Sequence, residues 1–325
     1  MTPPDPARYA MDAAAAIGAD YADLDDGGGY LFRVSKNGRS LIAGAGAICS
    51  FPVNSATAFS LSRDKAHTKT VLTAAGLPVA PGGLFFAHTR RAALRQPGRE
   101  ASDAAVFAAK LGWPVFCKPN TGSRGNFAEI VADPFALADY VRRVGVEFEA
   151  FLVEPILKGA EHRVLIHDGR VIFHASKSPP ALTGDGATSI ATLLSALNLS
   201  LAGSGISPYP SSVLQVASLD PAAIPAKGQR IALPGRRNLS AEGDIEIFSD
   251  TAPPALAALA AQGVAAVGLR VGAVDLFDTS PAGDLTQPAI LEVNGNPGLR
   301  TLELNGRTDL IRKLWISMLS EMLGT

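Results

Sequence analysis

The sequence lacks the residues that mark disulfide-stabilised and zinc-binding proteins. Its 325 residues include only two cysteines, Cys49 and Cys117, which lie far apart in the chain. Two cysteines so placed form neither a disulfide framework nor a zinc-ligand spacing. Both lie in apolar stretches, so we predict that they are buried, unreactive thiols.

An excess of charge of either sign is also missing. The chain carries 29 basic and 30 acidic residues, for a net charge of -1. A protein that binds nucleic acid or an anionic membrane through a broad surface needs a basic excess, so we expect neither partner. A local basic cleft is still compatible with this balance.

Long apolar runs and a secretory signal are absent from the sequence as well. The stretches Leu41–Val53 and Ala255–Leu269 both fall short of the ~18 apolar residues that a membrane span needs. The opening segment MTPPDPARYAMD has neither a charged start nor an apolar centre. These observations predict a soluble, cytoplasmic protein.

Two common nucleotide-binding motifs are missing. No segment matches GxxxxGK[ST], which excludes a classical P-loop. Gly44 and Gly46 supply half of a dinucleotide fingerprint, but no helix start with a third glycine follows them. We therefore exclude a Rossmann cofactor site.

What the sequence does contain is a large apolar fraction and a mixed pattern of elements. With 47% hydrophobic residues, the chain can form a large core and two or three connected lobes. Periodicity and end signals predict helices at residues 10–17, 62–75, 90–111, 134–144, 255–268 and 308–323. Strands are predicted at 113–119, 127–131, 151–157, 271–277 and 288–294, and a strand pair at 162–176. Antiparallel hairpins among them, one with the turn Asp168-Gly169, indicate an α+β architecture.

Two segments fit this pattern less well. Residues 1–62 are expected to be irregular, with a short helix, a glycine-rich turn and two strand-like pieces. Residues 200–228 are rich in Ser, Pro, Gly and Ala, which predicts an insertion or a loop.

Oxygen-bearing side chains gather in two strands near the C-terminus. Glu292 and Asn294 are two residues apart in one strand and so point to the same face. Asp275 lies in another strand and joins them if the two strands pair. Two carboxylates and an amide oxygen are hard ligands that suit Mg²⁺ bridging nucleotide phosphates. A glutamate between Leu and Val is costly without a charged partner, which argues against a solvated strand end.

Basic residues that could hold phosphates lie earlier in the chain. Lys118 ends an apolar strand just before a glycine-rich loop at residues 121–126. Backbone amides of such a loop can cradle phosphates, and the lysine adds a point charge. An ordinary hairpin turn explains the loop equally well, and an exposed helix lysine is the default interpretation of Lys69. Lys177 is a third candidate cation.

A third candidate segment is FLVEPILKGAEHRVL. Glu154 ends an apolar strand, and Glu161 follows seven residues later. Such a segment can hold adenine through backbone groups in an apolar slot and ribose through a carboxylate. Two ordinary surface glutamates would show the same spacing, so both interpretations stay open.

In this order along the chain, the candidate residues resemble the ATP-grasp superfamily. SRDKAHTKTVLTAAGLPVAP is similar to the opening helix and turn of the grasp in D-alanine–D-alanine ligases, cyanophycin synthetases and bifunctional glutathione synthetases. EHRVLIHDGRVIFHASKSPPALTGDGATSIATLL and RRNLSAEGDIE most resemble the cyanophycin and glutathione branch, and EVNGNPGL is a shared signature. The likeness extends from about residue 62 to the C-terminus.

The resemblance implies an ATP-grasp fold, in which two α/β subdomains grip ATP. It implies a short pre-grasp region at residues 1–62, a small subdomain with the glycine-rich loop at 63–155, and a large subdomain at 156–325. The large subdomain would carry the metal site and the insertion near 200–228.

The resemblance also implies a role for each candidate residue, with ATP and Mg²⁺ as cofactors. The expected phosphate contacts are Lys69, Lys118 and the loop residues Gly122, Ser123 and Gly125. The expected adenine and ribose contacts are Glu154, the backbone around Leu157, and Glu161. The expected Mg²⁺ ligands are Asp275, Glu292 and Asn294. Lys177 would approach the γ-phosphate, and the Gly298 N–H would stabilise the oxyanion of a tetrahedral intermediate.

The implied reaction joins a carboxylate to an amine. The carboxylate would attack the γ-phosphate of ATP, and an amine would displace phosphate from the resulting acyl-phosphate. The expected substrates are an amino acid or small peptide, and a homodimer is kept as a candidate assembly. A phosphotransferase on the same fold is the alternative, and a nucleotide-binding protein without ligation is a third.

Two positions depart from the D-alanine–D-alanine ligase pattern. Pro155 follows Glu154 where those ligases carry a lysine, and Ala273 stands where they carry an arginine for the intermediate. We expect Arg300 to replace that arginine, with Arg236 and Arg237 as alternatives. The N-terminal region of roughly 60 residues is also short for a family domain that helps to bind the acyl substrate.

Overall fold

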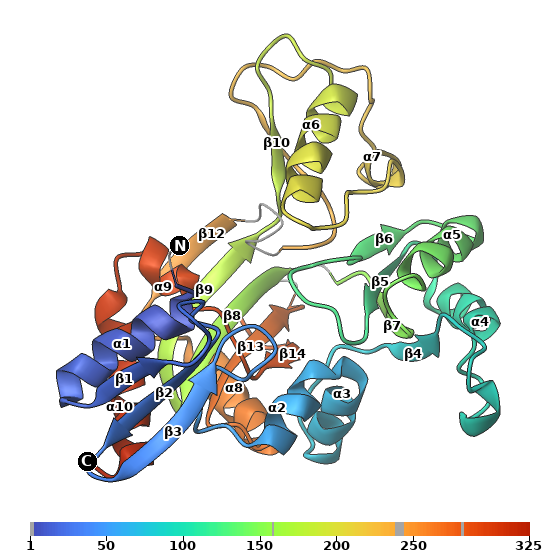
Figure 1. The fold of residues 1–325 in the computed structure, drawn as a ribbon. Helices are drawn as coiled ribbons and strands as arrows, with labels where there is room; N and C mark the ends of the chain where they lie inside the picture. The colour runs from blue at the N-terminus through green and yellow to red at the C-terminus, as the bar shows by residue number, and fades with distance from the viewer. Residues whose placement is uncertain (1–2, 158, 238–243, 281–282) are drawn as a thin grey trace.

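A computed structural model describes residues 3–157, 159–237, 244–280 and 283–325 of the chain. In these residues the fold comprises an N-terminal layer, two separate β-sheets and a small lobe that projects from the larger sheet (Figure 1). Mixed helices and antiparallel sheets confirm the predicted α+β class.

The N-terminal segment is more regular than its sequence predicts. Helix α1 (Asp5–Ile17) precedes a three-stranded antiparallel sheet of β1 (Asp20–Asp23), β2 (Leu31–Lys36) and β3 (Arg39–Gly44). The helix begins before the predicted residue 10 because a proline occupies its first turn, where no backbone donor is needed. It packs on the C-terminal helix α10 (Thr308–Leu323) around buried Trp315, so the first and last helices of the chain lie side by side.

The helix predicted at 62–75 is two helices. Helix α2 (Ala56–Arg63) ends at Asp64, whose extended backbone breaks the helix. The Asp64 carboxylate then accepts the His67 N–H at 2.9 Å and caps α3 (Lys65–Ala74).

The smaller sheet has the strand order β4-β7-β5-β6. Its strands are β4 (Gly83–Phe86), β5 (Val115–Pro119), β6 (Glu129–Val131) and β7 (Ala150–Pro155). The helix predicted at 90–111 is shorter in the structure, because a 3₁₀ turn at Ala92–Leu94 replaces its first part. Helix α4 (Ala101–Leu111) then begins at a capping box formed by Glu100 and Asp103. Helix α4 and α5 (Pro134–Val144), whose predicted bounds are confirmed, pack around Tyr140 and Phe151.

The larger sheet has the strand order β12-β9-β8-β13-β14. Its strands are β8 (Ala160–His167), β9 (Arg170–Ser178), β12 (Asp244–Ser249), β13 (Val271–Asp278) and β14 (Pro288–Asn294). The β8–β9 turn has positive φ at both Asp168 and Gly169, which confirms the predicted hairpin. One face packs on α8 (Pro254–Val267); the other carries the apolar contacts to the N-terminal layer and the charged side chains described below.

The chain between β9 and β12 forms a folded lobe. Strands β10 (Ala181–Thr183) and β11 (Arg230–Ala232) pair, and helices α6 (Ile190–Gly203) and α7 (Ser212–Val216) pack beside them around a core of their own. We call residues 181–233 the insertion lobe. Residues 200–228, expected to be an insertion or a loop, are part of this folded insertion and include a helix and core residues such as Tyr209. The sequence did not reveal the core, because the apolar residues of this segment are too irregularly spaced for periodicity to show it.

Short α9 (Arg300–Leu304) leads into α10. Among the helices in the described residues, none is both long and apolar enough to span a bilayer.

Candidate active site

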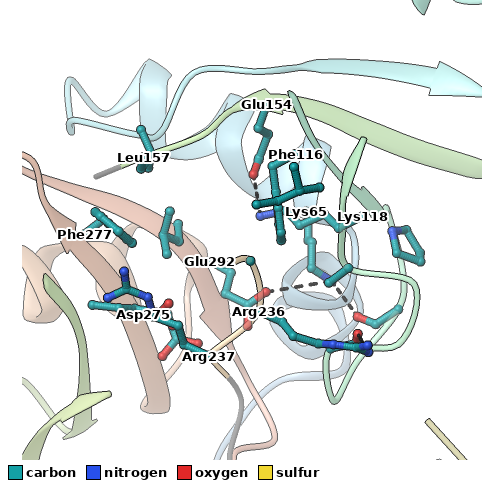
Figure 2. Close-up of a pocket in the computed structure, with 18 of the residues that line it drawn as sticks. Lys65, Phe116, Lys118, Glu154, Leu157, Arg236, Arg237, Asp275, Phe277 and Glu292 are labelled. Carbon is teal, nitrogen blue, oxygen red and sulfur yellow. Dashed lines mark hydrogen bonds and ion pairs between the residues drawn. The ribbon is translucent and has the colours of Figure 1, made fainter. Parts of the chain in front are cut away.

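A cavity lies between the two larger sheets, beneath the glycine-rich loop and beside the segment that follows the insertion lobe (Figure 2). Strands β5 and β7 of the small sheet and β13 and β14 of the large sheet each contribute lining residues. Segments as far apart in the chain as Lys65 and Glu292 therefore meet at one site, as the resemblance implies.

One wall of the cavity is apolar. It consists of Phe116, Ile130, Pro155, Ile156, Leu157, Phe277 and Leu291. A flat apolar slot next to a few charged groups is the usual form of a small-molecule site. Leu157, whose backbone we expected to contact adenine, is part of this wall, and Pro155 contributes ring surface in place of a polar side chain.

Glu154 is held by two lysines rather than left free for a ligand. Its carboxylate accepts from Lys118 Nζ at 2.9 Å and from Lys69 Nζ, which also donates to the Ala80 carbonyl at 2.8 Å. Burial alone would raise the pKa of Glu154, but attraction to Lys118 and Lys69 outweighs it and holds the pKa below its ordinary value. Lys118 and Glu154 line the cavity; Lys69 lies behind Glu154 and outside the lining.

Lys65 is a lining residue that the sequence analysis missed. It begins α3, one helical turn before Lys69, and its Nζ donates to the Gly122 carbonyl at 2.6 Å. The same atom lies 3.9 Å from Glu292 Oε2 across the cavity. Burial lowers the pKa of Lys65, and Glu292 offsets part of that effect. The contact between Lys65 and Gly122 joins residues 57 positions apart, which no local sequence pattern predicts.

The acidic end of the site forms as the strand pairing predicts. Asp275 and Glu292 are directly opposite each other in the antiparallel β13–β14 ladder and so share a face. Asn294 Nδ2 donates to Glu292 Oε1 at 2.9 Å. Asp275 and Glu292 line the cavity, while Asn294 lies just outside the lining.

Asp275 is the centre of a buried charge network. Arg163 donates to both of its oxygens, at 2.8 and 2.7 Å, and Lys177 Nζ lies 2.9 Å away. Lys177 also donates to Glu161 at 2.7 Å, so it bridges two acids instead of pointing freely into the cavity. Burial raises the pKa of Asp275, but Arg163 and Lys177 together hold that pKa well below its usual range. Arg163 was missed because only the β8–β13 register brings it opposite Asp275.

The oxygen donors of this face fit a hard divalent cation only in part. Glu292 and Asp275 supply carboxylate oxygens, yet the described residues hold no group of three or more His, Cys, Asp or Glu side chains that could bind an ion alone. Mg²⁺ is typically held by one or two carboxylates together with substrate phosphates, and this face matches that arrangement.

Two arginines follow the insertion lobe and line the cavity. Arg236 is 3% exposed, its Nη1 donates to the Gly125 carbonyl at 3.2 Å, and its guanidinium lies 4.1 Å over the Tyr209 ring. Its Nε and Nη2 atoms are buried without a hydrogen-bond partner among the described residues. Arg237 donates to the Gly159 carbonyl at 3.0 Å. Gly298 and Arg300 are exposed and outside the lining, so the structure brings the two alternative arginines to the cavity, not Arg300.

The glycine-rich loop covers one end of the cavity. Gly122, Ser123 and Gly125, the loop residues expected to contact phosphates, line it together with Arg124 and Asn126. Arg124 and Gly125 have φ of 58° and 74°, so the loop turns through the left-handed region at these two residues. The β5–β6 hairpin that carries the loop is confirmed by the pairing of Val115 with Val131.

Comparison with known proteins confirms the resemblance. The chain is 27% identical over 258 residues to the cyanophycin synthetase of Trichormus variabilis, covering 74% of this chain and 27% of that protein. It is 26% identical over 256 residues to the glutathione biosynthesis bifunctional protein of Enterococcus faecalis, covering 74% and 32%. The chain therefore spans about a third or less of the curated relatives it matches. No family model matches it.

Solved structures show the same fold. The bifunctional glutathione synthetase of Pasteurella multocida aligns with a TM-score of 0.50 and 21% identity, over 95% of this chain and 44% of that one. D-alanine–D-alanine ligase of Bacillus anthracis aligns with a TM-score of 0.50 and 15% identity, over 82% and 72%. The fold of this chain is thus the ATP-grasp fold, as predicted.

Proposed function

We propose that this chain is an ATP-dependent ligase that joins a carboxylate to an amine through an acyl-phosphate, with an amino acid or small peptide as substrate. One observation carries the proposal. A single cavity combines an apolar slot, lysines and arginines, and the opposed carboxylates Asp275 and Glu292, all in the ATP-grasp arrangement. The relatives named above are synthetases and ligases, which supports ligation over simple phosphoryl transfer.

In this proposal the apolar slot holds the adenine ring and Glu161 the ribose. Lys65 and Lys118 reach the phosphates from two sides, and backbone amides of residues 122–125 cover them. Lys69 holds Glu154 in place, so its effect on the nucleotide passes through that carboxylate. Lys177 fixes Glu161 and Asp275 in the same way.

Glu292 and Asp275 would hold Mg²⁺ with Asn294 at the edge of the site; the ion would neutralise charge on the phosphates. Arg236 would then face the negative charge that develops on the acyl group, because two of its buried donors have no other partner in the described structure. This role replaces the one expected for Arg300. The Gly298 amide remains a candidate for the oxyanion contact.

The same proposal includes subdomain limits at 63–155 and 156–325 and assembly as a homodimer. It also includes a cytoplasmic location without nucleic-acid or membrane partners. Small carboxylate and amine substrates are supported by the related ligases.

Phosphate release from Mg·ATP across pools of amino acids and dipeptides tests the proposed reaction. We expect at least one pool to yield a condensed product by mass spectrometry, with ADP and phosphate in equal amounts. Arg236→Ala should lower that rate at least 100-fold, as loss of a charge-stabilising donor does elsewhere, while Arg300→Ala serves as the matched control and stays near wild type. A stable phosphorylated product in place of a condensed one would show a kinase instead.

A further inference from the structure

The glycine-rich loop is bonded to the insertion lobe, although the two are about 80 residues apart in the chain. Ser207 Oγ accepts the Phe127 N–H at 2.7 Å, and the Ser207 N–H donates to Asn126 Oδ1 at 2.9 Å. Arg236 Nη1 lies 3.2 Å from the Gly125 carbonyl and 3.4 Å from Ser207 Oγ. The C-terminal end of the loop is thus joined to the lobe and to a lining arginine.

The loop also has contacts within its own subdomain. Lys65 Nζ donates to the Gly122 carbonyl at 2.6 Å, and Asn126 Nδ2 donates to Glu147 Oε2 at 3.5 Å. Tyr140 Oη donates to the Phe127 carbonyl at 3.0 Å, and the Phe127 ring packs edge-on against Phe148. Arg124 and Phe127 have positive φ, a conformation that is unfavourable for non-glycine residues without outside contacts. The bonds to Ser207 supply such contacts from the other side of the cavity.

Ser207 itself is firmly placed in the insertion lobe. Its neighbour Ile206 is buried in the lobe core. Two residues further, the Tyr209 N–H and carbonyl bond to the amide of Asn198 on α6, at 2.7 and 3.0 Å. Ser207 does not line the cavity, so its contact with the loop is not needed to bind a ligand directly.

We propose that Ser207 is a positioning residue through which the insertion lobe holds the glycine-rich loop closed over the nucleotide. This rests on the proposed ligase function. The lobe thereby controls both the affinity for ATP and the exclusion of water. With the loop open, water attacks the acyl carbon of the acyl-phosphate, the bond from that carbon to the phosphate oxygen breaks, and carboxylate and phosphate are released without an amide.

Three variants of the full chain test this role. Ser207→Ala removes the hydroxyl acceptor, Ser207→Thr retains it, and Ser204→Ala alters an exposed serine of the same lobe, for which the structure shows only backbone bonds. Hydrogen–deuterium exchange of the peptide spanning residues 122–131 is measured for each with and without Mg·ATP. The KM for ATP and the ratio of phosphate released to amide formed are measured alongside.

In Ser207→Ala we expect faster hydrogen–deuterium exchange of the loop and release of more phosphate than amide. The KM for ATP should rise about fivefold, as the loss of one hydrogen bond predicts. Ser207→Thr and Ser204→Ala should match wild type in all three readouts. Wild-type loop exchange and a ratio of one in Ser207→Ala would overturn the proposal. If the wild-type enzyme makes no amide from any pool, the ligase proposal fails, but loop exchange in the nucleotide-free variants still decides whether Ser207 holds the loop.

Discussion

At the scale of single residues, the acidic side chains of the site differ in whether a lysine or arginine is bonded to them. Glu154 is bonded to two lysines, and Asp275 to an arginine and a lysine. Glu292 differs, since it accepts from Asn294 and otherwise lies 3.9 Å from Lys65. Its carboxylate therefore retains the capacity to bind an ion.

This difference predicts separate outcomes for two isosteric substitutions. Glu292→Gln should abolish Mg·ATP turnover, by at least 100-fold, with little change in thermal stability. Asp275→Asn should abolish turnover and also destabilise the fold by about 3 kcal/mol, because buried Arg163 and Lys177 lose their charged acceptor. Phosphate-release assays with thermal and urea unfolding of both variants provide the measurement. Equal stability of the two variants would show that the ion pairs of Asp275 with Arg163 and Lys177 do not stabilise the fold.

At the scale of elements, the β8–β9 hairpin carries different chemistry on its two faces. Glu161, Arg163 and Lys177 face the cavity side of the sheet, whereas His162 and His174 lie buried on the opposite face. The two imidazoles are 3.0 Å apart between His162 Nδ1 and His174 Nε2. Burial lowers the pKa of both, and for His174 the neighbouring His162 lowers it further, to about 4. Asp278 partly offsets the effect at His162.

The histidine pair predicts a loss of stability in acid. A histidine whose folded pKa is about 4 and whose unfolded pKa is ~6.5 binds more protons when unfolded, so stability is complete above pH 6.5. It then falls by up to ~1.4 kcal/mol per pH unit as the pH drops toward 4. Urea unfolding at pH 7.5 and 5.0 measures this loss. It should shrink in His174→Gln and persist in His88→Gln, which changes an exposed histidine; equal losses in both would contradict a role for the pair.

At the scale of the whole molecule, the cavity belongs to no single layer. The small sheet supplies Lys118 and Glu154, the large sheet supplies Asp275 and Glu292, and the chain leaving the insertion lobe supplies Arg236 (Figure 2). A ligand that contacts all three parts stabilises their arrangement as a unit, because it binds the folded chain and not the unfolded one.

Binding of Mg·ATP should therefore raise the melting temperature. At a concentration of 100 times its Kd, a ligand adds ~2.7 kcal/mol to the free energy of unfolding, which corresponds to a shift of a few degrees for a chain of this size. Differential scanning fluorimetry with ATP, with and without Mg²⁺, measures the effect. Removal of Mg²⁺ with EDTA, or the Glu292→Gln substitution, should reduce the shift. A shift that is indifferent to both would argue against a metal-bridged nucleotide at this face.

The sequence by itself determined those features that depend on neighbours in the chain. The Asp168-Gly169 hairpin, the bounds of α5, and the loop between paired strands after Lys118 follow from turn chemistry, capping and periodicity within about a dozen residues. The order of the site residues along the chain was also enough to identify the fold, which the solved structures confirm.

Only the tertiary structure decided which side chains meet. In the structure Lys65 lines the cavity and Lys69 does not, and Arg236 lines it in place of Arg300. Arg163 lies directly opposite Asp275 in the β8–β13 pairing. The tertiary structure also gave the segment around Ser207 a core of its own and a bond to the glycine-rich loop. These contacts join residues tens to more than a hundred positions apart, and their geometry is set by strand register and burial, which local sequence patterns do not encode.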